Sequence, residues 1–309
     1  MILTVTLNTA LDITYRVPSL RPGTSHRVSE VTERPGGKGV NVARVLAALG
    51  HEVTVTGFSG GTTGRILRER LTGVPHLTDA LVPVSGTTRR TVAVVDERSG
   101  TTTQLNEPGP VITHAEWSAF QGVYEDLLAG ASAVALCGSL PPGVPVGAYA
   151  GLIRTARAAG VPTLLDTSGA ALRRGVAGRP DILKPNAEEL AGLTGSHEPL
   201  RATQEARRRG AGAVVASLGP EGLLAVTPEG RWRAAPPRRL RGNPTGAGDA
   251  AVAGLLSALV EHRPWPDRLA RAVALSTAAV TSRVAGEFDQ GAYEESLGRV
   301  TVAGEADVA

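Results

Sequence analysis

The sequence predicts an α/β fold in which a central, mostly parallel β-sheet is flanked by helices, with a smaller β-sheet beside it. The first observation is that short β-branched runs alternate with helical segments. The clearest runs, most of them followed by small polar residues, are 53–58, 132–138, 161–167, 181–186 and 213–219. Such alternation is typical of parallel strands between two layers of helices. In these sheets ligands bind at the carboxyl ends of the strands, where the small-residue loops fall.

The second observation is a pair of extended stretches that break the alternation. Residues 89–109 contain two extended runs around the turn ERSG, which is a hairpin signal. Residues 12–34 also look extended and lack a helical period. An edge hairpin of the main sheet would explain these stretches. We expect instead a separate small β lid, formed by about 12–34 and 85–107, over the strand ends.

The composition is that of an ordinary globular protein. A chain of 309 residues, 42% of them hydrophobic and 20% charged, can hold one large domain or two smaller ones. The net charge of +3 and the scattered basic residues argue against nucleic acid as a partner, but a small anionic substrate needs only a few cations. Neither a signal-peptide pattern nor an apolar run of about 18 residues is found, so we expect a cytoplasmic protein without a membrane partner.

Cysteine and histidine give no sign of a thiol or metal centre. Cys137 is the only cysteine, which excludes an internal disulfide and fits a reducing compartment. It lies in SAVALCG, which predicts a buried strand, so we interpret Cys137 as structural rather than nucleophilic. The six histidines, at 26, 51, 76, 114, 197 and 262, show no spacing typical of metal ligands.

The stretch NPTGAGDAAVAGLLSAL, at 243–259, predicts a helix whose first turn can hold an anion. Each glycine there costs the helix roughly 1 kcal/mol of stability relative to alanine. This cost suggests that backbone without side chains has a function at this position. A helix N-terminus exposes free amides and a partial positive charge, and glycines let an anion approach closely. The amides of Gly246, Ala247 and Gly248 could stabilise phosphoryl oxygens. Asp249 could then take a proton from an attacking hydroxyl.

Two other interpretations of this stretch remain open at this point. Asp249 could simply complement the helix dipole, and the motif alone favours neither role over the other. Gly246, Gly248 and Ala251 also match the dinucleotide pattern G-x-G-x-x-A. That match is weak because Pro244 stands where a strand should end and no strand with a terminal acid follows at the proper distance.

A second glycine-rich helix start lies in RPGGKGVNVARVLAALG, at 34–50. An apolar face at helical spacing and Gly50 at the end predict a helix here. Lys38 could supply charge to an anion, and Asn41 could form hydrogen bonds to hydroxyls. The segment is not a Walker A loop, because Gly39 follows the lysine in place of Ser or Thr.

Two further loops could contact phosphates or a metal. In KPNAEEL, Asn186 and Glu189 could hold Mg²⁺ through water, as hard oxygen ligands do. The same pair could instead form a capping box, and in isolation we favour the cap. In SLGPEG, at 217–222, a hydroxyl and two glycines suit nucleotide phosphates, although an ordinary turn would have the same composition.

Taken in order, the motifs resemble those of the ribokinase-like PfkB carbohydrate kinases. The segments that carry the resemblance are TLNTALD (6–12), GGKGVNVARVLAALG (36–50), GSLPPG (138–143), KPNAEEL (184–190), SLGPEG (217–222) and NPTGAGD (243–249). The likeness covers essentially the whole chain. It is greatest to the phosphosugar branch: 1-phosphofructokinases, tagatose-6-phosphate kinases and minor 6-phosphofructokinases. It implies a single ribokinase-like kinase domain over residues 1–309 that uses ATP and Mg²⁺.

The resemblance also implies roles for individual residues. Asp249 would be the catalytic base, with the backbone of Gly246, Ala247 and Gly248 as the anion hole. The substrate-binding residues would be Asp12, Gly37, Lys38, Asn41 and Arg89, with Ser139 and Arg27 as second contacts. The ATP-binding residues would be Lys184, Asn186, Ser217, Gly219 and Gly222. Glu189 and Asn186 would organise Mg²⁺, through water.

The resemblance points to a phosphorylated ketohexose as the acceptor. Lys38 and Arg89 favour a substrate that already bears phosphate, because a neutral sugar would leave two desolvated cations unpaired. Gln104 occupies a lid position that is arginine in the minor 6-phosphofructokinase, which has glycine where Lys38 stands. Both differences favour fructose 1-phosphate, giving fructose 1,6-bisphosphate, over fructose 6-phosphate.

Several functions other than fructose 1-phosphate phosphorylation remain possible from the sequence. Tagatose-6-phosphate kinase and 6-phosphofructokinase activities lie within the same branch, and a kinase of nucleosides or unphosphorylated sugars lies outside it. A non-catalytic sugar or nucleotide sensor is a function of another class, although binding alone would not require Asp249. The β lid forms a dimer contact in several members of the family, so we expect a homodimer.

Overall fold

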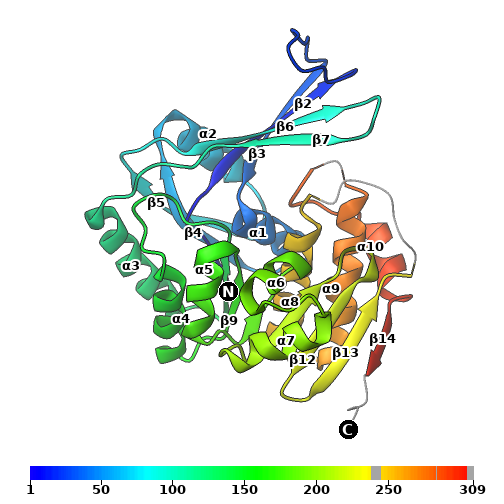
Figure 1. Cartoon of the computed structure of the whole chain (residues 1–309). Helices are drawn as coiled ribbons and strands as arrows, with labels where there is room; N and C mark the ends of the chain where they lie inside the picture. Colours follow the sequence, from blue (N-terminus) through cyan, green and yellow to red (C-terminus); the bar gives the residue numbers. More distant parts are fainter. Residues whose placement is uncertain (238–244, 283, 305–309) are drawn as a thin grey trace.

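The alternating runs of the sequence form one large β-sheet in the computed structural model, which describes residues 1–237, 245–282 and 284–304. Within these residues its strands follow the order β14-β13-β12-β11-β10-β9-β8-β1-β4-β5 (Figure 1). Their bounds are β1 (Ile2–Thr6), β4 (Val53–Gly60), β5 (Leu77–Val84), β8 (Ala133–Cys137), β9 (Thr163–Asp166), β10 (Ile182–Leu183), β11 (Ala213–Ser217), β12 (Leu223–Thr227), β13 (Gly230–Ala235) and β14 (Thr301–Gly304). The pairs from β5 to β11 are parallel, which confirms the predicted sheet.

The central strands are apolar along their whole length. All five residues of β1 are buried, and so are all five of β8, with Ile2 paired to Ala133. Strands of a parallel sheet are covered on both faces, so they read as continuous apolar runs rather than as alternating ones. Cys137, at the end of β8, is buried and free, as the structural interpretation predicted.

One edge of the sheet differs from the prediction. Strands β12, β13 and β14 extend it with antiparallel pairs beyond β11. The turn at 228–229 explains the reversal between β12 and β13, because two residues can join only antiparallel neighbours. The predicted turn after β11 is a short 3₁₀ segment, Gly219–Glu221, which leads directly into β12.

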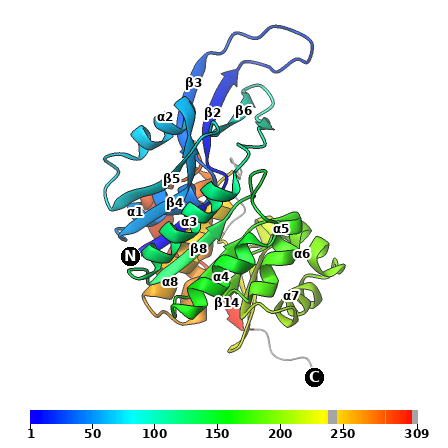
Figure 2. The same cartoon turned by 90° about the vertical axis from the view of Figure 1, so that its left-hand side faces the viewer.

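Helices cover both faces of the sheet (Figure 2). Their bounds are α1 (Lys38–Ala48), α2 (Gly61–Leu71), α3 (His114–Leu128), α4 (Ala148–Ala158), α5 (Gly169–Gly175), α6 (Ala187–Thr194), α7 (Pro199–Arg208), α8 (Ala247–Val260), α9 (Trp265–Val280) and α10 (Gln290–Leu297). One core packs α1, α8 and α9 against the sheet, and a second core packs α3 and α4 against the other face. Among the described residues, none of these helices has the length and apolar character needed to cross a membrane.

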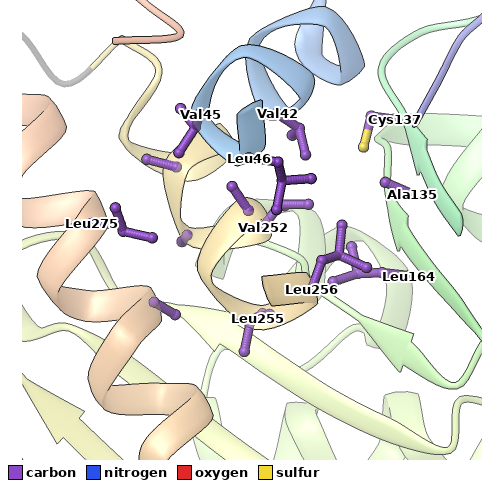
Figure 3. Packing of buried hydrophobic residues seen from close by; sticks show 14 of the residues in the cluster. Val42, Val45, Leu46, Ala135, Cys137, Leu164, Val252, Leu255, Leu256 and Leu275 are labelled. Carbon is purple, nitrogen blue, oxygen red and sulfur yellow. The ribbon is translucent and has the colours of Figure 1, made fainter. Parts of the chain in front are cut away.

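The contact between α1 and α8 positions the two glycine-rich helix starts. Leu46 of α1 and Val252 of α8 lie close together in the first core, and both are fully buried (Figure 3). Both helices begin at the edge of the sheet where the parallel strands end. The two motifs that the sequence marks as anion-binding therefore start beside each other.

The extended stretches form a separate second sheet, as predicted. It consists of β3 (Glu30–Gly36), β2 (Ala10–Val17), β6 (Arg89–Asp96) and β7 (Thr102–Asn106), in that order. Strands β6 and β7 make the predicted hairpin, and β2 pairs with β6 in parallel. This second sheet projects beyond the carboxyl ends of the large sheet (Figures 1 and 2). The interpretation of 89–109 as an edge hairpin of the main sheet is therefore wrong.

The pairing gives the second sheet two unlike faces. Ile13, Val92 and Leu105 lie opposite one another across three strands, so they share one face. Asp12 and Thr91 lie opposite each other on the other face. The apolar face is only partly covered, since α2 packs against β2 and β3 while Leu105 stays 60% exposed.

Candidate active site

Helix α8 begins where the sequence predicts it. Gly246 is its N-cap, with a left-handed φ of 88°. A Cβ atom at this position would lie 2.8 Å from backbone and side chain of Ala285, so both conformation and packing require glycine. The residues before it, Asn243 and Pro244 of the predicted motif, lie outside the described residues.

Asp249 lies in the first turn of α8 and is buried, with 7% of its surface exposed. Its Oδ2 accepts a 2.8 Å hydrogen bond from Nδ2 of Asn41 on α1. Burial raises the pKa of Asp249 to about 6. The positive charge of Lys38 lowers this pKa, whereas the negative charge of Asp166 raises it further. A carboxylate with a pKa close to neutral is suited to accept a proton from a hydroxyl.

Asn41 has a partner within the protein that the sequence analysis did not predict. Its side-chain amide donates to Asp249, and its contact with sugar hydroxyls stays a prediction. Its Oδ1 is buried and has no hydrogen-bond partner among the described residues. The amide thus orients the carboxylate, a role that sequence spacing could not reveal because the two residues are 208 positions apart.

A buried acid that the sequence analysis missed holds two lysines together. Asp166 ends β9 and is fully buried, and its Oδ1 lies 3.2 Å from Nζ of Lys38 and 3.4 Å from Nζ of Lys184. Although burial opposes ionisation, the two ammonium groups hold the pKa of Asp166 below its usual range. Burial likewise opposes the charge of Lys38, yet Asp166 and Asp249 raise its pKa. The sequence did contain one signal for this residue: Asp166 ends the predicted strand VPTLLD, and ligands bind at the carboxyl ends of such strands.

The pairing of Lys38 corrects one sequence argument. Lys38 was expected to be a desolvated cation that only a substrate phosphate could neutralise. Asp166 already neutralises it in part, so a requirement for a phosphorylated substrate must rest on other residues. Lys184 also faces the helix start, since a Cβ atom on Gly248 would lie 3.7 Å from its Nζ.

A cavity of about 700 Å³ opens between the strand ends and the second sheet. Gly37, Lys38, Arg89 and Ser139, all predicted substrate contacts, line it. The lining residues that sequence reasoning did not single out include Thr6, Asn8, Asn106, Glu107, Thr167 and Ser168. The cavity thus has one wall from the large sheet and one from the second sheet.

Arg89 and Asp12 hold the second-sheet side of this site. Nε of Arg89 donates to the carbonyl of Asn8 and its Nη1 to the carbonyl of Glu107, both at 3.3 Å. Burial lowers the pKa of Arg89, with Asp12 opposing the shift. Burial raises the pKa of Asp12 to about 6, and Arg89 opposes that change. Asp12 packs over Gly36, where a Cβ atom would lie 2.2 Å from its carboxyl group.

The two predicted nucleotide loops lie next to each other. Asn186 and Ser217 form a parallel bridge, which joins the KPN and SLG motifs. Asn186 and Glu189 form the capping box favoured by the sequence, with each side chain accepting the other's amide at 2.8 Å. Gly219 and Gly222 both have left-handed φ angles, 59° and 88°. No cluster of three or more potential His, Cys, Asp or Glu ligands occurs among the described residues.

Two residues of the second sheet lie away from the cavity. Arg27 is exposed in the loop at 18–29, and it is not among the residues that line the cavity. Gln104 is exposed on β7 and is likewise absent from the lining. Arg27 does not line the cavity of its own chain, and its contact with the substrate stays a prediction.

Comparison with known proteins agrees with this architecture. The family model described as "pfkB family carbohydrate kinase" matches residues 4–290. The tetrameric inhibited form of Escherichia coli phosphofructokinase-2 is 30% identical over 96% of this chain and 98% of its own, with a TM-score of 0.87. The same protein in complex with fructose-6-phosphate is 29% identical over the same shares, also at 0.87.

A further similar structure comes from another bacterium. A possible 1-phosphofructokinase of Thermotoga maritima is 28% identical over 99% of this chain and 100% of its own, with a TM-score of 0.86. The family model spans nearly all of the chain. The chain belongs to the pfkB family of carbohydrate kinases.

Proposed function

We propose that this sugar kinase transfers the γ-phosphoryl group of ATP to a ketohexose that already carries a phosphate, with fructose 1-phosphate as the preferred acceptor. The observation that carries the proposal is the position of Arg89 on the cavity wall. Its hydrogen bonds go to two backbone carbonyls and a hydroxyl, so among the described residues no carboxylate pairs with it directly. A half-buried guanidinium of this kind suits a phosphate oxygen.

In this proposal Asp249 is the general base. Its carboxylate takes the proton of the acceptor hydroxyl, which then attacks the γ-phosphorus in line. Asn41 holds the carboxylate in place, and the amides of Gly246, Ala247 and Gly248 stabilise charge on the phosphoryl oxygens. Lys38 and Lys184 add positive charge on the same side, kept in place by Asp166.

The nucleotide would lie along the second group of loops. Lys184, Asn186, Ser217, Gly219 and Gly222 are the proposed ATP contacts. Oε1 of Glu189 has no hydrogen bond to a described residue, because the capping box uses Oε2, so it can accept from a metal-bound water. Bound Mg²⁺ would supply further neutralisation of the phosphate charges.

The second sheet would act as a lid and as a dimer contact. Asp12, Arg89 and Ser139 would hold the sugar phosphate, while closure of the sheet would exclude water as a competing acceptor. Val31 and Leu105 support the dimer, since both are more than half exposed on the apolar face. In such a dimer Arg27 could reach only the partner's cavity, because it lies outside its own.

A panel of acceptors tests the proposal. Fructose 1-phosphate, fructose 6-phosphate, tagatose 6-phosphate, fructose, ribose and a nucleoside are compared in a coupled assay of ADP release. We expect the highest kcat/KM with fructose 1-phosphate and the lowest with unphosphorylated sugars. A preference for a free sugar or a nucleoside would contradict the phosphosugar assignment. Tight ATP binding without turnover of any acceptor would favour a sensor.

A further inference from the structure

Asn8 occupies the point where the second sheet leaves the large sheet. It follows β1 within the predicted segment TLNTALD, whose single acid, Asp12, already has a proposed role. The residue is 6% exposed, although it forms part of the cavity wall. A buried amide in this position needs hydrogen-bond partners, since an unpaired one is costly.

The two N–H groups of the Asn8 side chain bind two different chain segments. Nδ2 donates to the carbonyl of Pro108 and to Oγ of Ser139, both at 3.1 Å. Pro108 lies where the chain returns from β7, and Ser139 lies in the loop after β8. An asparagine amide has only these two hydrogens to donate, so none remains for a ligand.

The side-chain oxygen of Asn8 lies against Gly109. Its Oδ1 is buried and has no hydrogen-bond partner among the described residues. A Cβ atom on Gly109 would lie 2.2 Å from it, and Gly109 has a φ of 97°, so glycine is needed there for close approach as well as for conformation. Both N–H groups of Asn8 are used within the protein, so we expect the side chain to act through the residues that it holds.

The backbone of Asn8 links the same segments to Arg89. Nε of Arg89 donates to the carbonyl of Asn8, and its Nη1 donates to the carbonyl of Glu107, next to Pro108. Three of the chain crossings between the two sheets, at 7–9, 85–89 and 107–110, are therefore tied together by one asparagine and one arginine. Ser139, on the opposite wall, joins them through the Asn8 amide.

We propose that Asn8 is a positioning residue that fixes Arg89 and Ser139 relative to each other for the phosphate of the acceptor sugar. This inference rests on the proposed function. Losing the amide frees segment 107–110 and the hydroxyl of Ser139 while leaving Asp249 and the nucleotide loops unchanged. The loss must therefore act on acceptor binding and leave phosphoryl transfer from ATP nearly unaltered.

The test measures steady-state kinetics with fructose 1-phosphate and ATP in the presence of Mg²⁺. In Asn8→Ala we expect the KM for fructose 1-phosphate to rise about tenfold, with kcat and the KM for ATP changed less than about threefold. Asn8→Asp has the same shape but no N–H donor, so it should raise this KM at least as much. In Asn8→Ala/Ser139→Ala the KM should rise by less than the product of the two single effects.

Thr163→Val is the matched control. Thr163 is 1% exposed, binds Asp181 through its hydroxyl at the start of β9, and is not among the residues that line the cavity. The Thr163→Val substitution should lower the melting temperature without changing the KM for either substrate. If Asn8→Ala does not fold, Asn8→Ser replaces it, because a shorter side chain cannot reach both acceptors.

Three results would overturn the inference: an unchanged acceptor KM in both Asn8 variants, equal rises in the KM for sugar and for ATP, or an unaltered KM in Asn8→Asp alone. If the wild-type enzyme prefers another sugar, the proposed substrate fails, whereas the same variants measured with that sugar still decide the role of Asn8.

Discussion

The two walls of the cavity are built in different ways. On the large-sheet side, behind the lining residue Lys38, Asp249, Asp166 and Lys184 are each less than 10% exposed and bind one another or their neighbours. On the second-sheet side, Arg89 and Asp12 are only partly buried. The first side is a network of charges set in a packed core, whereas the second is carried by a separate sheet with one face only partly covered.

This difference separates two kinds of function. A preorganised network of buried charges suits the chemical step, because it costs no reorganisation when charge develops. Groups on a projecting sheet suit recognition, since they can adjust with the acceptor. Substitutions on the large-sheet wall should therefore lower kcat, and those on the second-sheet wall should raise the KM for the sugar.

The largest expected effect is that of Asp249→Asn. Removal of a positioned base should lower kcat by about 10²–10⁴-fold. The asparagine can still accept the hydrogen bond from Asn41, so the melting temperature should change little. Turnover is measured beside a thermal unfolding curve. Activity above a tenth of the wild-type value would show that Asp249 is not the base.

The next effect is that of Asp166→Asn, which removes the counter-charge of two lysines. We expect a loss of about 3 kcal/mol in the free energy of unfolding, the usual cost of breaking a buried ion pair, together with a lower kcat. Denaturant unfolding provides the measurement. Glu69→Gln, which breaks an exposed pair with Arg65, serves as control and should cost less than about 1 kcal/mol. Equal costs for the two variants would refute the idea of a stabilising buried network.

Arg89→Ala tests the other wall. The KM for ketohexose phosphates should rise by the equivalent of about 2–3 kcal/mol, as for a lost charge-assisted hydrogen bond, with kcat largely retained. Arg90→Ala is the control, because Arg90 lies on the opposite face of β6 and pairs with Glu107. A KM that stays the same for all ketohexose phosphates would remove Arg89 from the site.

A pH dependence, which needs no substitution on the large-sheet side, distinguishes the acids of the two sides. The pKa values of Asp249 and Asp12 are both raised to about 6, so each carboxylate is protonated as the pH falls below that value. A protonated Asp249 cannot accept a proton, and a protonated Asp12 binds sugar hydroxyls differently. We expect kcat/KM to fall below pH 6. In a plot of log(kcat/KM) against pH, the limiting slope should be two for the wild type and one for Asp12→Asn. An identical acid limb in both would assign the titration to Asp249 alone.

Much of the fold could be predicted because its signals are local. Apolar runs gave the parallel strands, the turn ERSG gave the hairpin, and the glycine-rich stretches marked the starts of α1 and α8. The antiparallel edge beyond β11 was missed because β12 follows its turn without any helical segment to mark a change.

The site was less predictable because its main contacts join distant residues. Lys38 and Asp166 are 128 positions apart, and nothing in either motif indicates that they pair. Asn8 was passed over because its amide acts on residues 100 and 131 positions away. Spacing can place a residue at a strand end, but only the fold determines which strand ends meet.

The second sheet has one apolar face and one face toward the acceptor, and this difference constrains how the enzyme can change over evolutionary time. Side chains alternate along a strand, so one inserted or deleted residue inside β6 would turn Val92 toward the acceptor and Thr91 outward. Gains and losses of length should accumulate in the bends at 18–29 and 97–101, where no alternation has to be kept. Descendants with new sugar preferences should accordingly differ from this chain by point replacements within the strands and by length only at their tips.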